Sequence, residues 1–277
     1  MRTALIQLNV TDDPAENLPV TLEYIRQAVA GGAKFVLTPE VSNCISTSRS
    51  HQNAVLQHEE DDDSLRALRD AARTHGIWLL IGSLGLKTHD KDGRFANRSF
   101  MIDPQGEIIA RYDKIHMFDV QVTPEETFRE SDGYRPGRNA ICAETDFGTV
   151  GMTVCYDVRF AALHVALARA GAKILTVPAA FSPVTGAAHW HTLLRARAIE
   201  TGCYVLAPAQ TGTHASASHK TRSTYGHSLV VDPWGEVQLD AGSEPGVYMT
   251  DLDMGKVDEA RGKIPSLTNA RQFSGPE

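Results

Sequence analysis

Two reactive side chains stand at the ends of predicted strands. Glu40 follows the apolar run "FVLTP", and Cys155 follows "TVGMTV", shortly before a predicted helix that starts near Phe160. In parallel βα architecture, ligands gather where strands end and helices begin. Helix N-terminal dipoles at such a position favour the thiolate over the thiol. Cys155 is therefore a candidate nucleophile, and the alternative is a buried structural thiol.

A third candidate is Lys114, in the polar stretch "RYDKIHMFD" that follows the predicted strand "EIIAR". A lysine beside a thiolate can hold its negative charge and later donate to an oxyanion. The alternative is a solvated surface lysine, which would do neither. Residue type alone leaves both roles open.

The segments that must position these residues alternate between strand and helix. Apolar patterns in the N-terminal half predict strands over 3–10, 34–40 and 77–85 and helices over 14–33 and 63–76. We expect Gly31 and Gly32 to end the first helix. The second should be capped by Asp63 or Ser64 and end at Gly76. This alternation predicts parallel strands joined by helices.

Two turns of composition Asp-Pro-x-Gly-Glu, at 103–107 and 232–236, each join a predicted hairpin. The hairpin strands cover 97–103 with 107–113, and 227–232 with 236–240. Between the hairpins lie predicted strands over 149–154, 173–180 and 204–209 and helices over 160–171 and 189–202. We expect an α/β fold in which two mixed sheets pack face to face with helices outside. Because such turns are common, two unrelated hairpins are the alternative to a repeat.

The composition points to a protein that acts on small solutes. Lysine and arginine number 27 against 34 acidic residues, and a net charge of -7 gives no reason to expect nucleic acid or an anionic membrane as partner. The N-terminus lacks the long apolar region of a secretory signal, and no apolar run is long enough to span a bilayer. We expect a cytoplasmic protein.

Cysteine and histidine spacing does not predict a metal site. The cysteines lie far apart and should be free thiols in a reducing compartment: Cys44, Cys142, Cys155 and Cys203. Three histidines of the second half, His189, His191 and His227, also lack the spacing of a ligand set.

Three segments together resemble the motifs of the nitrilase, or carbon-nitrogen hydrolase, superfamily: "TPE" at 38–40, "DKIHMFD" at 113–119 and "CYDVRF" at 155–160. The resemblance extends from "ALIQLN" near the N-terminus to "GVYMTDLDMGKVDEARGKIP" at 246–265. The segments 185–210 and 225–236 further resemble the branch that contains deaminated-glutathione amidases and ω-amidases. The resemblance implies a four-layer αββα sandwich, a single domain over residues 1–277, and no cofactor.

By the same resemblance, Glu40 is the general base, Lys114 the cationic stabiliser and Cys155 the nucleophile. The family also carries a second carboxylate between the lysine and the cysteine, which corresponds here to Glu130. Such residues can attack an amide with sulfur, protonate the departing nitrogen and hydrolyse the thioester that remains. Lys114 and the backbone N–H of Tyr156 would form the oxyanion hole.

The substrate pocket is less sharply defined. Arg159 could pair with a substrate carboxylate, or it could serve Asp157 or a helix end. Phe181 and Trp190 could wall the pocket or pack in the core. Segment 211–224 is expected to be a mobile loop, either at the rim of the site or simply solvated.

The implied function is a thiol amidase that acts on a small ω-amide, either deaminated glutathione or an α-keto-acid ω-amide. Alternatives are a nitrilase or N-carbamoyl amidohydrolase on the same scaffold, and a non-catalytic protein that binds a small acid. Members of the family usually pair, so a homodimer or higher homo-oligomer is expected. Ala162, Ala187 and the loop 119–130 depart from the branch pattern around the pocket, which leaves the exact substrate open.

Overall fold

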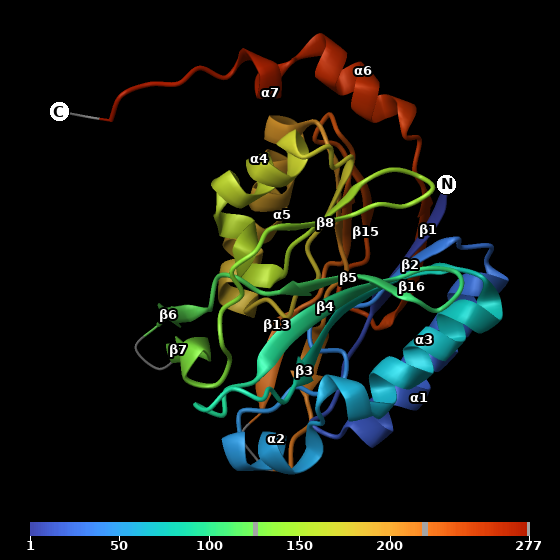
Figure 1. The fold of residues 1–277 in the computed structure, drawn as a ribbon, viewed down its shortest axis with the longest axis vertical. Helices are drawn as coiled ribbons and strands as arrows, with labels where there is room; N and C mark the ends of the chain where they lie inside the picture. The colour runs from blue at the N-terminus through green and yellow to red at the C-terminus, as the bar shows by residue number, and fades with distance from the viewer. Residues whose placement is uncertain (124–126, 218–220, 276–277) are drawn as a thin grey trace.

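The computed structural model describes residues 1–123, 127–217 and 221–275 and contains two six-stranded mixed sheets (Figure 1). The first sheet has the order β16 (Gly246–Asp251), β1 (Arg2–Gln7), β2 (Phe35–Leu37), β3 (Trp78–Leu86), β4 (Ala96–Ile102) and β5 (Ile108–Asp113). The second has the order β15 (Val237–Asp240), β14 (Leu229–Val231), β11 (Tyr204–Ala207), β10 (Ile174–Thr176), β9 (Val150–Met152) and β8 (Ile141–Ala143). The predicted pair of mixed sheets is confirmed.

Helices cover the outer faces of the two sheets. On one side lie α1 (Pro14–Ala30) and α3 (Asp63–His75), and on the other lie α4 (Ala161–Arg169) and α5 (Pro183–Thr201) (Figure 1). Strand β2 shows the alternation that produces these layers. Phe35 and Leu37 belong to the same buried cluster as Met152 of the second sheet. The intervening Val36 packs in the cluster of Ile25 on the helical side.

The two halves repeat the same order of elements around the two Asp-Pro-x-Gly-Glu turns. The β4–β5 and β14–β15 pairs are both antiparallel, and Gly106 and Gly235 both have a positive φ, of 80° and 89°. In each half, one helical arginine donates its Nε to the turn glycine at 2.8 Å, from Arg69 in α3 and from Arg195 in α5. This shared contact supports a repeat over a chance pair of turns.

Several predicted boundaries need correction. The N-cap of α3 is Asp62, whose side chain accepts a hydrogen bond from the backbone of Leu65, rather than Asp63 or Ser64. Gly76 does end that helix, in the left-handed conformation. Helix α5 begins at Pro183, six residues earlier than the apolar pattern indicated, because proline is well suited to the first helical turn.

The segment 211–224 is more regular than a mobile loop. Its two ends form the antiparallel strands β12 (Thr211–His214) and β13 (Arg222–Tyr225), while residues 218–220 lie outside the described part of the chain. The sequence pattern also missed the small elements near the site: α2 (Arg49–Val55), the pair β6 (Asp119–Gln121) and β7 (Thr127–Arg129), and three 3-10 turns, η1 (Glu59–Asp61), η2 (Glu130–Asp132) and η3 (Cys155–Arg159).

The C-terminal segment includes α6 (Gly255–Lys263) and α7 (Ser266–Asn269), beyond which the chain extends away from the sandwich (Figure 1). Among the described residues, no helix is both long and apolar enough to cross a membrane.

Candidate active site

A cavity of about 800 Å³ opens where strand ends from both halves meet. The predicted catalytic residues Glu40, Lys114, Glu130 and Cys155 all line it. Three of them are almost fully buried, with 4% of Glu40, 2% of Lys114 and 6% of Cys155 exposed. A small ligand of the size that such a cavity admits would therefore meet all four groups away from bulk water.

Each of these side chains leaves a different element. Glu40 follows β2, Lys114 follows β5, Glu130 begins η2, and Cys155 begins η3 shortly after β9. The backbone of Cys155 has a φ of 52°, an uncommon conformation for a residue with a side chain, and its N–H donates to the carbonyl of Pro178 at 2.9 Å. This sharp turn exposes the sulfur at the floor of the cavity instead of continuing the strand.

Lys114 joins the two carboxylates of the site. Its Nζ donates to Glu40 Oε1 at 2.9 Å and lies 2.9 and 2.8 Å from the two carboxylate oxygens of Glu130. Glu130 is fixed in turn by the backbone N–H of Phe118, which donates to Oε2 at 2.7 Å. The lysine is thus a buried ion-pair centre, and its interpretation as a surface residue is wrong.

Glu40 is held on its other side by the protein backbone. Its Oε2 accepts the N–H of Ala180 at 2.7 Å, and its own carbonyl accepts a hydrogen bond from the side chain of Gln210 at 3.0 Å. The Cys155 thiol lies close enough to Glu40 that the carboxylate charge raises the pKa of the thiol. The carboxylate therefore has one oxygen oriented by lysine, the other oriented by the backbone, and a thiol proton within reach.

Asn97 is a contributor that the sequence reading missed. Its Nδ2 donates to Glu40 Oε1 at 2.8 Å and lies 3.4 Å from Glu130 Oε1, so it crosses between the carboxylates beside Lys114. Its Oδ1 is buried and has no hydrogen-bond partner among the described residues. The only signal in the sequence was a polar residue at the start of an apolar strand, which is too common to single out.

The charges of the cluster follow from burial and proximity. Burial alone would raise the pKa of Glu40, but the charge and hydrogen bond of Lys114 outweigh it and leave that pKa below its usual value. Burial alone would lower the pKa of Lys114, but the charges of Glu130 and Glu40 raise it well above its usual value. The resting site therefore holds an ionised Glu40 beside the ammonium ion of Lys114.

The sulfur behaves differently from the sequence expectation. Burial raises the pKa of the Cys155 thiol well above its ordinary value, the charge of Glu40 raises it further, and Lys114 offsets only part of this. The preference for a resting thiolate at a helix N-terminus is thus wrong here. A protonated sulfur beside an ionised glutamate instead predicts that attack and proton transfer occur together.

The comparisons with known proteins agree with this site. The model of the carbon-nitrogen hydrolase family matches residues 2–262. The chain belongs to the carbon-nitrogen hydrolase family. It is 43% identical over 235 residues to a deaminated glutathione amidase from Yersinia enterocolitica, a match that covers 84% of this chain and 80% of that protein.

Two solved structures support the assignment. The NitFhit protein of C. elegans superposes with a TM-score of 0.89 at 34% identity, covering 98% of this carbon-nitrogen hydrolase and 65% of that longer chain. A variant of the amidase from Nesterenkonia sp. AN1 superposes with a TM-score of 0.79 at 27% identity, covering 98% and 94% of the two chains. That amidase carries the acetamide moiety of fluoroacetamide covalently added at its active-site cysteine.

The predicted substrate-binding residues of this carbon-nitrogen hydrolase lie at different depths. Phe181 lines the cavity, whereas Trp190 is fully buried behind it, with ring centroids 4.8 Å apart. The Trp190 indole donates to the carbonyl of His227 at 2.8 Å. Its assignment to the pocket wall is therefore corrected: it supports Phe181 from the core.

Tyr156 and Arg159 are not among the residues that line the cavity. The Tyr156 ring packs edge-on against Phe118, which does line it. The guanidinium of Arg159 lies 5.5 Å from the Phe181 ring centroid and within 3.3 Å of the imidazole of His189. Arg159 thus borders the pocket wall from outside, and it does not serve Asp157 through any contact among the described residues.

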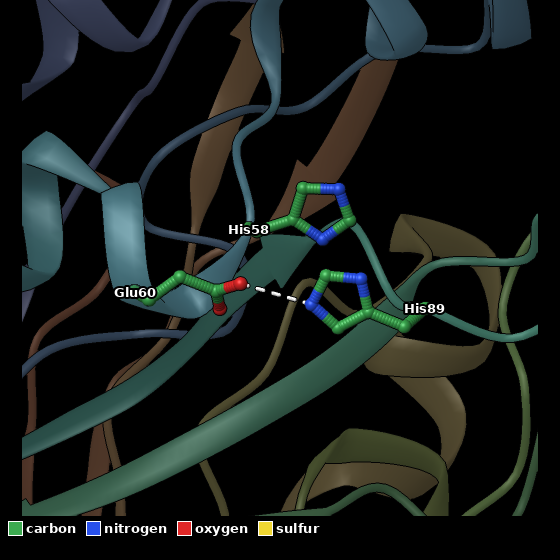
Figure 2. Close-up of side chains that lie close together, drawn as sticks. All are labelled: His58, Glu60 and His89. Carbon is green, nitrogen blue, oxygen red and sulfur yellow. Dashed lines mark hydrogen bonds and ion pairs between the residues drawn. The ribbon is translucent and has the colours of Figure 1, made fainter.

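Among the residues that the structure describes, two clusters of this carbon-nitrogen hydrolase contain metal-type ligands, although the sequence spacing did not suggest them. In the first, His58 and His89 stack with their rings 4° from parallel, while Glu60 hydrogen-bonds to His89 at 2.9 Å (Figure 2). Ring-nitrogen lone pairs lie in the ring planes, so parallel stacked rings do not direct them at one ion. In the second, His191 and His227 both bond to the carboxylate of Asp240.

Proposed function

We propose that this hydrolase cleaves the amide C–N bond of deaminated glutathione, or of a related small ω-amide, through a thioester on Cys155. The observation that carries the proposal is one ammonium group, Lys114 Nζ, within 2.9 Å of both Glu40 and Glu130 beside a buried thiol. The relatives named above as amidases support the same reaction class.

In the first step, Cys155 Sγ attacks the amide carbon while its proton passes to Glu40. The amide oxygen gains the negative charge that Glu40 has just lost, so the total charge beside Lys114 does not change. The ammonium carries three protons, and a shared contact with the two oxygens of Glu130 requires only one of them. One proton remains for Glu40 and one for the new oxyanion.

Collapse of this intermediate expels the nitrogen, which takes the proton from Glu40 and leaves as an amine or ammonia. Glu40 is then ionised again and accepts a proton from water as the water attacks the thioester carbon. A second oxyanion forms next to Lys114, and its collapse breaks the C–S bond and releases the carboxylic acid. Cys155 recovers its proton from Glu40, which completes the cycle without a cofactor.

The test is to mix the protein with an ω-amide, quench within one turnover and measure the intact mass. A mass increase on Cys155 equal to the acyl group supports the proposal, and Cys155→Ala should show neither the adduct nor release of amine. Turnover that survives Cys155→Ala would refute it. Binding of the amide without release of amine or ammonia would instead favour the small-acid-binding alternative.

A nitrilase or an N-carbamoyl amidohydrolase would use the same sulfur, so the substrate panel must include nitriles and N-carbamoyl compounds. Ammonia release from primary amides, but from neither nitriles nor N-carbamoyl compounds, would separate these reactions. We further propose that residues 1–277 act as a single cytoplasmic domain and that the protein pairs as a homodimer, as members of its family usually do. Sedimentation equilibrium of the purified protein tests the pairing.

A further inference from the structure

A cationic side chain lines the cavity and has no carboxylate partner among the described residues. Arg222, in β13, is one of the residues that line the same cavity as Cys155. Its Nη2 donates to the carbonyl of Ala180 at 2.6 Å, and its guanidinium lies 5.7 Å from the Phe128 ring centroid. Its Nε is buried and has no hydrogen-bond partner in the described part of the chain.

The anchoring of this guanidinium places it next to the catalytic groups. Ala180, whose carbonyl accepts from Arg222, donates its own N–H to Glu40 Oε2 at 2.7 Å. Ala180 therefore links Arg222 to the general base Glu40. No described carboxylate pairs with the guanidinium of Arg222. A planar guanidinium with free donors matches a carboxylate in a bidentate contact.

The other arginines near the cavity are less suited to this task. Arg129 also lines the cavity, but it is exposed to solvent and its Nη1 donates to the carbonyl of Phe128. Arg49 donates to the backbone carbonyls of Gly93 and Gly133 and covers the Phe95 ring, which occupies its guanidinium. Arg159, the residue that the sequence favoured for a substrate carboxylate, does not line the cavity.

We propose that Arg222 binds the carboxylate at the far end of the substrate's acyl chain. The substrates would then be ω-amides of small dicarboxylic acids, with the amide carbon at Cys155 and the carboxylate at Arg222. This inference rests on the proposed amidase function and adds the residue that selects for the substrate's free carboxylate. Deaminated glutathione fits, because its acyl portion ends in a carboxylate.

The test compares glutaramate with 5-methylhexanamide, in which an uncharged branched end replaces the carboxylate at equal length. The quantity compared is the kcat/KM for glutaramate divided by the kcat/KM for 5-methylhexanamide. In Arg222→Gln this ratio should fall about 100-fold relative to the wild type, because the variant lacks the guanidinium that favours the charged substrate over the uncharged one. Arg222→Lys keeps the charge but loses the fork, so its ratio should fall less. Arg159→Gln is the matched control and should leave the ratio unchanged.

An unchanged ratio in Arg222→Gln, or an equal fall in Arg159→Gln, would overturn the inference while leaving the amidase function intact. Failure of the wild type to hydrolyse either amide would instead refute the proposed function. A binding measurement covers variants with weak activity: glutarate should protect Cys155 from iodoacetamide in the wild type. Arg222→Gln should need at least about tenfold more glutarate for equal protection, and equal protection at equal glutarate would count against Arg222.

Discussion

Tyr112 donates its phenolic hydroxyl to Asp157 across 2.6 Å, joining the strand that leads to Lys114 with the turn that begins at Cys155. Asp157 is fully buried and also accepts the backbone N–H of Val154 at 2.9 Å. Its other oxygen accepts from both the backbone and the imidazole of His116, at 3.0 and 2.7 Å. One carboxylate thus sets the position of the ammonium relative to the sulfur, although it does not touch the proposed reacting atoms.

Replacing Asp157 with Asn should disturb this alignment. An amide offers one acceptor oxygen where two are used, and its NH₂ group would face donors. We expect a loss of about 3 kcal/mol in the free energy of unfolding and a fall in kcat of more than about tenfold, with a smaller change in KM. Urea titration and steady-state kinetics on an ω-amide measure both quantities.

The matched control for Asp157→Asn is Tyr112→Phe, which removes only one of the bonds to the carboxylate. We expect it to cost about 1 kcal/mol of stability and to change kcat only a few-fold. A wild-type kcat in folded Asp157→Asn would show that the carboxylate is structural and does not position the catalytic groups.

Lys114→Met removes the ammonium while keeping a side chain of similar length. We expect kcat to fall about 100-fold or more, because an oxyanion donor is lost. The acid limb of the pH profile should also shift to higher pH. Without the lysine charge, burial raises the pKa of Glu40, so a higher pH is needed to ionise this base. Lys114→Arg, which keeps the charge, should leave that limb near its wild-type position. An unchanged acid limb in Lys114→Met would contradict the electrostatic role given to this residue.

The wild-type pH profile follows from the same groups. Lys114 holds the pKa of Glu40 below its ordinary 4.5, so the base should stay ionised as the pH falls toward that value. Lys114 itself has a pKa well above 10.5 and should stay charged far into the alkaline range. We therefore expect kcat/KM to stay level from about pH 5 to pH 9. A clear inflection near pH 6.5, measured with a three-buffer system of constant ionic strength, would implicate a histidine and contradict the assignment of Glu40 as base.

The sequence predicted the two sheets correctly, and it placed the candidate reacting groups at strand ends, for identifiable reasons. Strand β2 has only three residues, but its apolar pattern and the position of Glu40 after it were both readable because strand ends in βα folds share an edge. Glu130 was found only through resemblance, since it lies in a short 3-10 turn with no periodic pattern. Its contact with Lys114 joins residues sixteen positions apart in the chain.

Groups that act through long-range contacts were not predictable from local pattern. Arg222 lies in the segment expected to be a mobile loop, and its position depends on the carbonyl of Ala180, 42 residues earlier. The raised pKa of Cys155 likewise follows from burial by distant segments, which no local signal reveals. The helix-dipole argument considered only the neighbours of the sulfur in sequence, so it gave the wrong direction.

Asp62 provides a test of the fold that is separate from the catalytic site. It caps α3 by accepting the backbone N–H of Leu65 at 2.7 Å, yet burial raises its pKa from 3.8 to about 6, against the effect of its hydrogen bonds. The folded protein therefore binds this proton more tightly than the unfolded chain does. Between pH 3.8 and about 6 the contribution of Asp62 to stability falls as the pH rises, and above that range the full cost of ionisation is present.

Asp62→Asn removes the charge and keeps an oxygen that can cap the helix. Above pH 7 we expect the variant to be more stable than the wild type by about 2 kcal/mol, somewhat less than the full cost because a neutral cap interacts more weakly with the helix dipole. Below about pH 3 the difference should disappear, because the wild-type carboxyl is then protonated in both states. Urea titrations from about pH 2.5 to pH 8 measure this, and Asp63→Asn, on the exposed neighbouring side chain, is the control. A variant that is less stable than the wild type at pH 8 would show that the ionised cap stabilises α3 by more than its burial costs.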